Sequence, residues 1–382
     1  MKPVLFVTGH APAYRVGAFA RLHEREQIEL ALFGGRSLHG GADYQGELPF
    51  PHRSVHPREL AALAASGRYR AVVCPTGGRL APLATWAGAR RARVPLILWA
   101  SLWAHPRSAA HALSYLPLRR LYRAADAVVT YGPHVSAYVS ARGARNVYVA
   151  AQAVDNDFWR AAAQAPPSDR LWPTGARLRF LFVGRPVAGK GLPLLVSAWR
   201  SAQLDASATV LVLAGVGADT HLDGSAAAQA GPAPSPTDGV RNKRGELAAP
   251  IVCLDPLAPA QLRDVYAACD VLVVPSVPTR TFREPWGLVV NEAMNQGLAV
   301  IATDAVGAAA GGLVRDGANG LIVPAGDRIG LAGAITRLAE DPDLRADMGA
   351  AGAQDVLAFD YDAWAEGFSR AFASLGVARG RW

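Results

Sequence analysis

The sequence predicts an α/β chain of two doubly wound domains, each built on a parallel sheet. Short apolar runs alternate with helical patterns along the first part of the chain, and the same alternation restarts after a connector rich in Ala, Pro and Ser. A length of 382 residues also suits two or three domains with substantial cores. We therefore expect two α/β units, one after the other.

The first unit, residues 1–160, is predicted from apolar runs of the kind that forms buried parallel strands. The expected strands are Val4–Thr8, Ile28–Phe33, Ala71–Cys74, Pro95–Trp99, Ala127–Thr130 and Val147–Ala150. Helical patterns between them are Tyr14–Glu26, Pro57–Ala65 and Leu118–Ala125.

The second unit, residues 161–355, follows the same alternation. Its expected strands are Arg179–Val183, Thr209–Ala214, Ile251–Leu254, Val271–Val274, Ala299–Ala302 and Gly320–Val323. Residues 218–250 carry no apolar periodicity and are rich in Gly, Pro, Ser and Asp, which predicts a flexible insert. The stretch Leu344–Leu375 is helical in pattern, and we expect residues 356–382 to cross back to the first unit. Three aromatic residues of this C-terminal stretch lie on one helical face and are expected to pack against the core: Trp364, Phe368 and Phe372.

Composition excludes several classes of protein. With 51% hydrophobic and 18% charged residues the chain is globular, and its three cysteines lie too far apart for a disulfide framework or a zinc site. The longest apolar stretch, Val94–Ala104, is far shorter than the roughly 20 residues of a spanning helix. The first residues also lack the pattern of a secretory signal. These features together favour a cytoplasmic protein.

Positive charge is concentrated in the first unit. Residues 1–160 hold 20 Lys and Arg against 9 Asp and Glu, whereas residues 161–382 hold 19 against 22. This asymmetry favours an anionic partner for the first unit, such as phospholipid headgroups or a phosphorylated substrate. The alternative is an Arg-rich surface that is merely solvated.

Two carboxylates in the segment 282–327 are candidates for ligand binding. Glu284 and Glu292 are eight positions apart, with Gly287 between them. If the chain is helical from Leu288 onward, the N–H groups at the helix start favour an anion such as a diphosphate. Glu292 would then bind a vicinal diol such as a ribose, and Glu284 would accept hydrogen bonds from nearby hydroxyls. The simpler alternative is a glutamate that only complements the helix dipole.

A glycine-rich segment follows a predicted buried strand at residues 180–199. Its sequence, FLFVGRPVAGKGLPLLVSAW, lacks the spacing of a Walker A loop. Arg185 and Lys190, at the carboxyl end of the strand, would instead supply two cations to a phosphate. The alternative is a turn with two exposed cations.

Together these segments resemble the retaining, nucleotide-sugar-dependent glycosyltransferases of the GT-B fold, family 4 (glycosyl transferases group 1). The matching pieces are VGRPVAGKG, AACDVLVVPS, EPWGLVVNE followed by AMNQGLAVIAT, and DGANGLIVPAGD; upstream, AYRVGAFARL, RAADAVVTYGPHVSAYVSARGA and AVDNDFW also match. The resemblance covers nearly the whole chain except the insert. It implies two Rossmann-like domains facing a central cleft, the first binding the acceptor and the second the nucleotide-sugar donor.

The resemblance also implies roles for individual residues. Arg185 and Lys190 would neutralise the donor diphosphate, whose growing negative charge is what the enzyme must stabilise. Glu292 would bind the ribose, and Glu284 hydroxyls of the transferred sugar. The implied donor-binding set is Gly184, Arg185, Lys190, Glu284, Trp286, Gly287, Leu288 and Glu292. Of these, Trp286, Gly287 and Leu288 would act through their backbone N–H groups. The implied catalytic set is Arg185, Lys190, Glu284 and His105.

On the acceptor side the family usually presents a histidine on a loop after a middle strand. His105, in LILWASLWAHP, stands at that place, although a loop histidine without a role is the alternative. Gly9 and His10 are further candidates for contact with the acceptor. The family often shows paired glycines here, whereas this chain has the single Gly9 before His10. Because of this difference, the resemblance does not determine the shape of that loop.

No metal or cofactor is expected. The Asp-x-Asp pairs at 155/157, 341/343 and 360/362 lie in the connector or beside helix starts, where capping or turn roles are expected. Two cations and a helix terminus would serve the diphosphate instead.

These observations predict a retaining, metal-independent glycosyltransferase with a front-face mechanism, with a UDP-sugar favoured over a GDP-sugar. The acceptor would be a hydroxyl in glycolipid, polysaccharide or glycoside biosynthesis, and no nucleic acid is expected as a partner. The basic, apolar segment Leu116–Arg123 favours peripheral contact with the inner membrane face. The alternatives are a non-catalytic nucleotide-sugar-binding protein and a GT-B-like sugar epimerase or phosphorylase.

Overall fold

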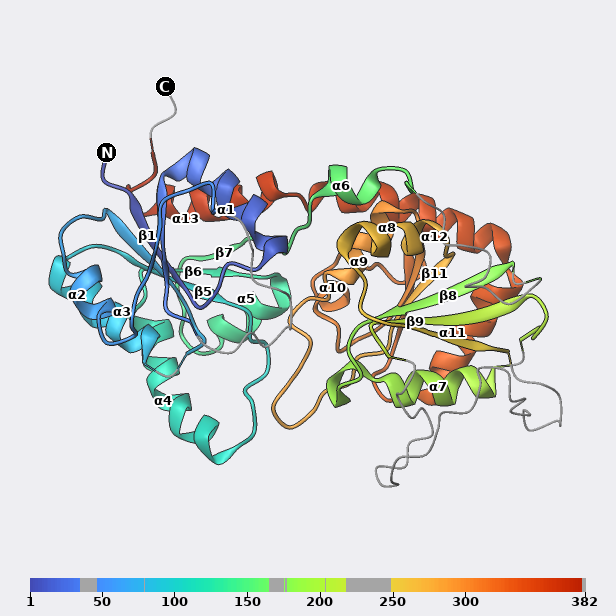
Figure 1. The fold of residues 1–382 in the computed structure, drawn as a ribbon. Coiled ribbons are helices and arrows are strands. Elements are labelled where there is room, and N and C mark those ends of the chain that lie inside the picture. The colour runs from blue at the N-terminus through green and yellow to red at the C-terminus, as the bar shows by residue number, and fades with distance from the viewer. Residues whose placement is uncertain are drawn as a thin grey trace. The chain divides into compact units, whose positions relative to one another are not determined.

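The computed structural model of the chain describes residues 1–34, 47–78, 80–164, 175, 177–202, 204–217 and 249–379. The chain divides into two compact units, Met1–Asp155 with Ala358–Trp382, and Asn156–Leu357 (Figure 1). Apart from Ala249 and Pro250, the expected insert at 218–250 lies outside the described residues.

The first unit contains a parallel sheet of seven strands in the order β3-β2-β1-β4-β5-β6-β7. The chain winds outward from β1 on one side and then returns to continue from β4 on the other, as in doubly wound folds. The strands are β1 (Val4–Thr8), β2 (Ile28–Leu32), β3 (His52–Ser54), β4 (Ala71–Pro75), β5 (Leu96–Ala100), β6 (Ala127–Thr130) and β7 (Val147–Val149). All six predicted strands are confirmed to within one residue. The prediction missed β3, because this short edge strand is polar and half exposed.

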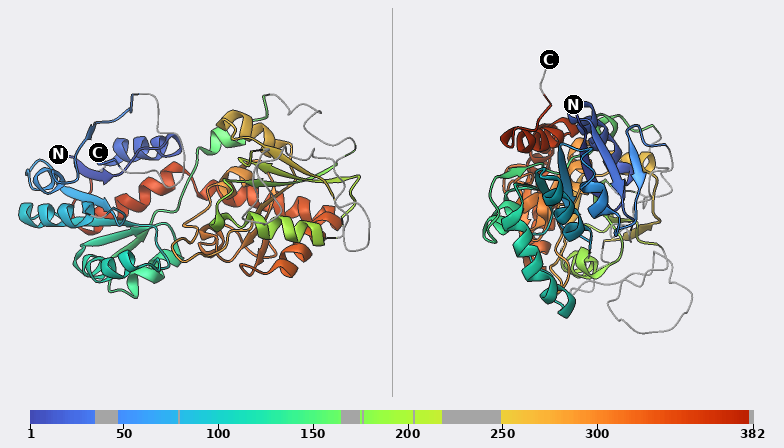
Figure 2. Two further views of the ribbon diagram at one scale, coloured as in Figure 1. Left: turned by 60° about the horizontal axis from the view of Figure 1, so that its bottom comes forward. Right: turned by 90° about the vertical axis from the view of Figure 1, so that its left-hand side faces the viewer.

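Helices cover both faces of this sheet, as the views of Figure 2 show. One face packs against α1 (Ala13–Glu26) and α13 (Tyr361–Ser374), and the other against α2 (Leu60–Ala64), α3 (Ala81–Ala92), α4 (Ala109–Ala124) and α5 (Pro133–Ser140). Both faces of each central strand are therefore buried, which explains why these strands are continuous apolar runs.

The C-terminal helix α13 packs beside α1 in the first unit (Figure 1). Its aromatic stripe of Trp364, Phe368 and Phe372 is fully buried, as predicted, and contacts the rings of Phe6 and Trp99. The helical pattern at Leu344–Leu375 is confirmed, and it belongs to two successive helices. The chain forms α12 (Pro342–Asp355) and a 3-10 turn (Val356–Ala358), and α13 then restarts where the Asp360 side chain accepts a hydrogen bond from the N–H of Ala363.

The helix predicted at Leu118–Ala125 is too short. In the structure α4 begins at Ala109, where the side chain of Ser108 caps it by accepting a hydrogen bond from the N–H of His111. Leu113 and Leu116 on its first half are 81% and 68% exposed. Because these leucines face solvent, they produce no periodic pattern of buried positions that could mark the helix.

The second unit holds a parallel sheet of six strands in the order β10-β9-β8-β11-β12-β13. Its strands are β8 (Leu178–Val183), β9 (Thr209–Ala214), β10 (Ile251–Leu254), β11 (Val271–Val274), β12 (Ala299–Thr303) and β13 (Gly320–Val323), each within one residue of its prediction. Its helices are α6 (Asn156–Arg160), a 3-10 turn (Ala188–Lys190), α7 (Leu192–Ser201), α8 (Pro259–Ala267), α9 (Val289–Asn295), α10 (Gly307–Ala310), α11 (Arg328–Glu340) and α12. Side chains of α7 and α11 share one core with the sheet.

No helix within the described ranges combines the length and the apolar character that crossing a bilayer requires.

Candidate functional site

The candidate donor residues lie at the point of the second sheet where the winding direction reverses, between β8 and β11. Open α/β sheets bind ligands at the carboxyl ends of strands beside such a switch point. The loops that follow β8 and β11 are joined here, because the N–H of Val277 donates to the carbonyl of Gly189 at 3.1 Å. Gly191 allows this approach: its φ is +70°, and a Cβ on it would lie 1.9 Å from the carbonyl oxygen of Pro275.

The two loops bring together two of the predicted donor residues. Lys190 Nζ lies 2.6 Å from Glu284 Oε2, and the two side chains are 24% and 5% exposed. Ser276 Oγ donates to the same carboxylate oxygen at 3.4 Å. Lys190, predicted to bind a phosphate, and Glu284, predicted to bind sugar hydroxyls, therefore form an ion pair. Arg185 lies on the same loop as Lys190, and its side chain is exposed.

The turn from Glu284 to α9 is held by both backbone and side-chain contacts. The indole N–H of the buried Trp286 donates to Asn291 Oδ1 at 2.8 Å, and the Trp286 carbonyl accepts from the N–H of Ala308 at 2.7 Å. Gly287 adopts a φ of +95°, which disfavours any residue with a Cβ. The helix begins at Val289, one residue after the predicted start at Leu288.

Glu292 lies in the first turn of α9 and contacts a neighbouring helix. The hydroxyl of Tyr266, on α8, donates to Glu292 Oε2 at 2.8 Å. Burial raises the pKa of Glu292 to about 7, and the hydrogen bond from Tyr266 opposes this shift. Burial and the nearby carboxylate also raise the pKa of Tyr266 well above its usual value. Glu292 is therefore a carboxyl that changes charge near neutral pH and can accept hydrogen bonds from a diol.

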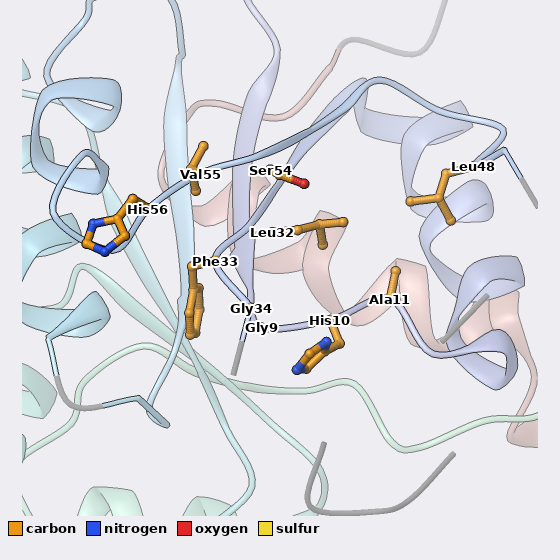
Figure 3. A pocket seen from close by; sticks show the side chains of 10 residues that line it. All are labelled: Gly9, His10, Ala11, Leu32, Phe33, Gly34, Leu48, Ser54, Val55 and His56. Carbon is orange, nitrogen blue, oxygen red and sulfur yellow. The ribbon is translucent and has the colours of Figure 1, made fainter. Parts of the chain in front are cut away.

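The predicted acceptor-side residues do not all lie together. His105, on the loop between β5 and α4, has hydrogen-bond partners for both ring nitrogens within the first unit: Nε2 donates to the carbonyl of His111 at 2.8 Å, and Nδ1 accepts from Tyr138 at 3.4 Å. Gly9 and His10 instead line a pocket at the carboxyl end of β1 (Figure 3), to which His105 does not contribute.

Two of the predicted aspartate caps are confirmed. Asp341 Oδ1 accepts from the N–H of Leu344 at the start of α12, and Asp360 Oδ1 accepts from the N–H of Ala363 at the start of α13. Across the described ranges, no group of three or more His, Cys, Asp or Glu side chains is arranged to hold a metal ion.

Sequence reasoning missed the partner of Glu292. Tyr266 precedes Glu292 by 26 positions and belongs to a different helix, so that only the packing of α8 against α9 brings them together. Ser276, by contrast, ends the quoted segment AACDVLVVPS, and its place after a predicted strand was a usable signal.

Comparison with known proteins finds a family match within the second unit. Residues 177–341, less than half of the chain, match the family described as glycosyl transferases group 1. The D-inositol 3-phosphate glycosyltransferase of Corynebacterium diphtheriae is 37% identical over 132 residues, which are 33% of this chain and 29% of that protein. The enzyme of the same name from Streptomyces scabiei is 39% identical over 110 residues, 28% of this chain and 22% of its own. The matches thus span less than a third of these relatives.

Solved glycosyltransferase structures extend the likeness to both units. Anabaena HepE in complex with UDP and glucose superposes with a TM-score of 0.69 at 18% identity, over 98% of this chain and 100% of that one. Sucrose-phosphate synthase from Thermosynechococcus elongatus gives 0.69 at 19% identity, over 98% and 99%. An E. coli protein bound with UDP-2-fluoro glucose gives 0.68 at 13% identity, over 99% and 100%. The predicted GT-B fold is confirmed.

Proposed function

We propose that the chain is a retaining glycosyltransferase that moves a sugar from a nucleotide diphosphate sugar to a hydroxyl acceptor of a glycolipid, polysaccharide or glycoside. The observation that carries the proposal is the pairing of Lys190 with Glu284 at the switch point of a group 1 domain, on loops that lead to Glu292. UDP is the favoured nucleotide, and the binding of UDP or a UDP-sugar by two of the structural neighbours supports this choice.

In the proposed reaction the acceptor oxygen forms a bond to the anomeric carbon while the bond from that carbon to the diphosphate oxygen breaks. Attack comes from the face that the diphosphate leaves, so that the configuration is retained. The acceptor proton passes to an oxygen of the departing diphosphate. Charge grows on that diphosphate, and fixed cations that stabilise it lower the barrier.

The chain's own side chains have distinct tasks in this reaction. Lys190 and Arg185 would bind the diphosphate, and Glu284 would exchange part of its contact with Lys190 for hydroxyls of the transferred sugar. Glu292 would accept hydrogen bonds from the ribose. Because the two cations neutralise the diphosphate, we propose that no divalent ion is needed. His105 stays a candidate on the acceptor side.

Retention can be tested before the acceptor is known, because many glycosyltransferases slowly transfer the sugar to water. We expect proton NMR of UDP-α-D-glucose incubated with the enzyme to show α-glucose first and β-glucose only later, by mutarotation. Release of β-glucose first would contradict retention. No release by the wild type, together with tight binding of the donor, would favour a non-catalytic binding protein.

We also propose that α4 brings the enzyme to a membrane surface. On the exposed side of this helix Leu113, Leu116, Arg120 and Arg123 follow at spacings of three and four, so that they share one face. Residues 101–125 contain no Asp or Glu. Exposed leucines beside arginines suit the interface of an anionic bilayer, where apolar side chains insert and cations meet headgroups.

A further inference from the structure

A pocket of about 570 Å³ opens at the carboxyl ends of β1, β2 and β3 in the first unit. It lies next to the switch point of the first sheet, between β1 and β4, and so occupies the place where such a sheet binds a ligand. Its lining residues are Gly9, His10, Ala11, Leu32, Phe33, Gly34, Leu48, Ser54, Val55 and His56 (Figure 3).

The chemistry of this lining is mostly apolar. Leu32, Phe33, Leu48, Val55 and Ala11 present aliphatic or aromatic carbon, and the polar side chains are two imidazoles and one hydroxyl. In the view of Figure 3 the ring of Phe33 lies between the imidazoles of His10 and His56. Small-molecule sites typically combine such a majority of apolar side chains with a few polar groups that orient the ligand.

The same lining disfavours a phosphorylated ligand. Among the described residues that line the pocket there is no Lys and no Arg. Moving a phosphate into a largely apolar pocket costs much of its hydration energy, which bidentate or charge-assisted hydrogen bonds must replace. Arg119, Arg120 and Arg123 of the basic first unit lie instead on α4.

We propose that this pocket binds an uncharged apolar group of the acceptor, such as an alkyl chain joined to the hydroxyl-bearing part. The term acceptor rests on the proposed function, whereas the preference for an apolar ligand rests on the pocket alone. An apolar group is favoured because its burial against Leu32, Leu48 and Val55 removes hydrocarbon from water.

The preference is measured by calorimetric titration of the full chain, without a donor, with methyl, butyl and hexyl β-D-glucoside and with glucose 6-phosphate. We expect affinity to rise with chain length, by about fourfold for each methylene that becomes fully buried. Leu48→Asn should weaken hexyl glucoside binding at least about tenfold, since it puts a polar amide on the pocket wall. Leu80→Asn, the same change at a leucine of the same unit that is 59% exposed and does not line the pocket, should leave it unchanged.

Val55→Thr is a second variant of the pocket wall, in case Leu48→Asn impairs folding. It replaces a methyl group by a hydroxyl with nearly the same side-chain shape, and it should also weaken the binding of hexyl glucoside. UDP-glucose binding by each variant, measured in parallel, reports whether the second unit is intact. Equal affinity for all three glucosides, or stronger binding of glucose 6-phosphate than of hexyl glucoside, would overturn the inference. Loss of chain-length dependence in Leu80→Asn instead of Leu48→Asn would do the same. If the glucosides behave as expected but no nucleotide sugar binds, the proposed function fails and the apolar pocket stands.

Discussion

At the scale of single residues, the candidate site depends on side chains that are far apart in the sequence. Lys190 and Glu284 are 94 positions apart. Lys190 was predicted from its place after a buried strand, and Glu284 from its spacing to Glu292 just before an expected helix start. That they touch could not be predicted, since it depends on how two loops cross above the sheet. Tyr266 gave no signal at all, because a tyrosine in an amphipathic helix is normally a packing residue.

Replacing the lysine of this pair should affect catalysis more than binding of the nucleoside. We expect Lys190→Met to lower kcat/KM for UDP-glucose hydrolysis by about 10² to 10³-fold, because a fixed cation next to the developing charge is lost. Arg315→Met is the control: it removes a cation of the same unit whose partner, Asp355, lies in an exposed ion pair.

The variant also leaves Glu284 buried without its lysine, which by itself destabilises the unit. The double variant Lys190→Met with Glu284→Gln should therefore recover thermal stability but not activity. Recovery of activity along with stability would show that the lysine has only a structural role.

The raised pKa of Glu292 makes donor binding depend on pH. We expect the affinity for UDP-glucose to increase as pH rises through about 7, because the ionised carboxyl accepts ribose hydroxyls more strongly. UDP-glucose suits the titration, since its diphosphate lacks the terminal group that in free UDP titrates near pH 6. In Glu292→Gln the affinity should be lower and independent of pH over this range. An unchanged pH profile in the variant would assign the titration to another group.

Stability should respond to pH in the opposite sense. The unfolded chain ionises Glu292 near its ordinary pKa of 4.5, whereas the folded chain does so near 7. The contribution of Glu292 to the free energy of unfolding is therefore smallest above pH 7 and largest below about pH 4.5. Chemical denaturation should show that Glu292→Gln stabilises the second unit at pH 8 relative to wild type, and less so at pH 5. Equal effects at both values would contradict a buried, titrating carboxyl.

At the scale of elements, buried strands are predictable and exposed ones are not. The strands of both sheets, apart from β3, are apolar runs because helices cover both faces, and their limits follow the runs closely. The first half of α4 shows the converse: its leucines face solvent, and the sequence alone gives no periodicity there. The start of α13 is marked by the capping aspartate Asp360, a local signal that the sequence does show.

The loop from β8 to α7 should tolerate no side chain at Gly191. Gly191→Ala would place its Cβ against the carbonyl of Pro275, so we expect the loops after β8 and β11 to separate and UDP-glucose affinity to fall at least about tenfold. Gly297→Ala is the matched control, with a φ of +74° and no atom within 4 Å of the added carbon. It should lose only about 1 to 2 kcal/mol of stability and keep its affinity. Similar affinities for both variants would mean that the contact between the loops does not shape the donor site.

At the scale of the whole molecule, the two units divide the tasks. The unit that matches the glycosyltransferase family carries the candidate donor residues and is slightly acidic, whereas the other carries the apolar pocket, the exposed leucines of α4 and most of the positive charge. Composition alone predicted this asymmetry of charge but could not separate an anionic substrate from a membrane. The proposed membrane contact rests on the exposed leucines and arginines of α4.

Membrane contact can be tested with vesicles. We expect the protein to sediment with vesicles of phosphatidylglycerol and phosphatidylcholine at low salt, and less at high salt, as electrostatic attraction to anionic lipid requires. Replacing Leu113 and Leu116 by Asn should abolish sedimentation, whereas Ile329→Asn, at an exposed position of the second unit, should not. Sedimentation of the leucine variant at the wild-type level would exclude α4 as the contact.

The donor site is tested most directly by calorimetric titration of the full chain with UDP, GDP, UDP-glucose and GDP-mannose in the presence of EDTA, on wild type and on Glu292→Ala. We expect UDP and UDP-glucose to bind in the micromolar range, EDTA not to weaken their binding, and Glu292→Ala to remove most of the affinity. Binding that requires a divalent ion would contradict the metal-independent site. Failure of every nucleotide to bind would contradict the glycosyltransferase assignment itself.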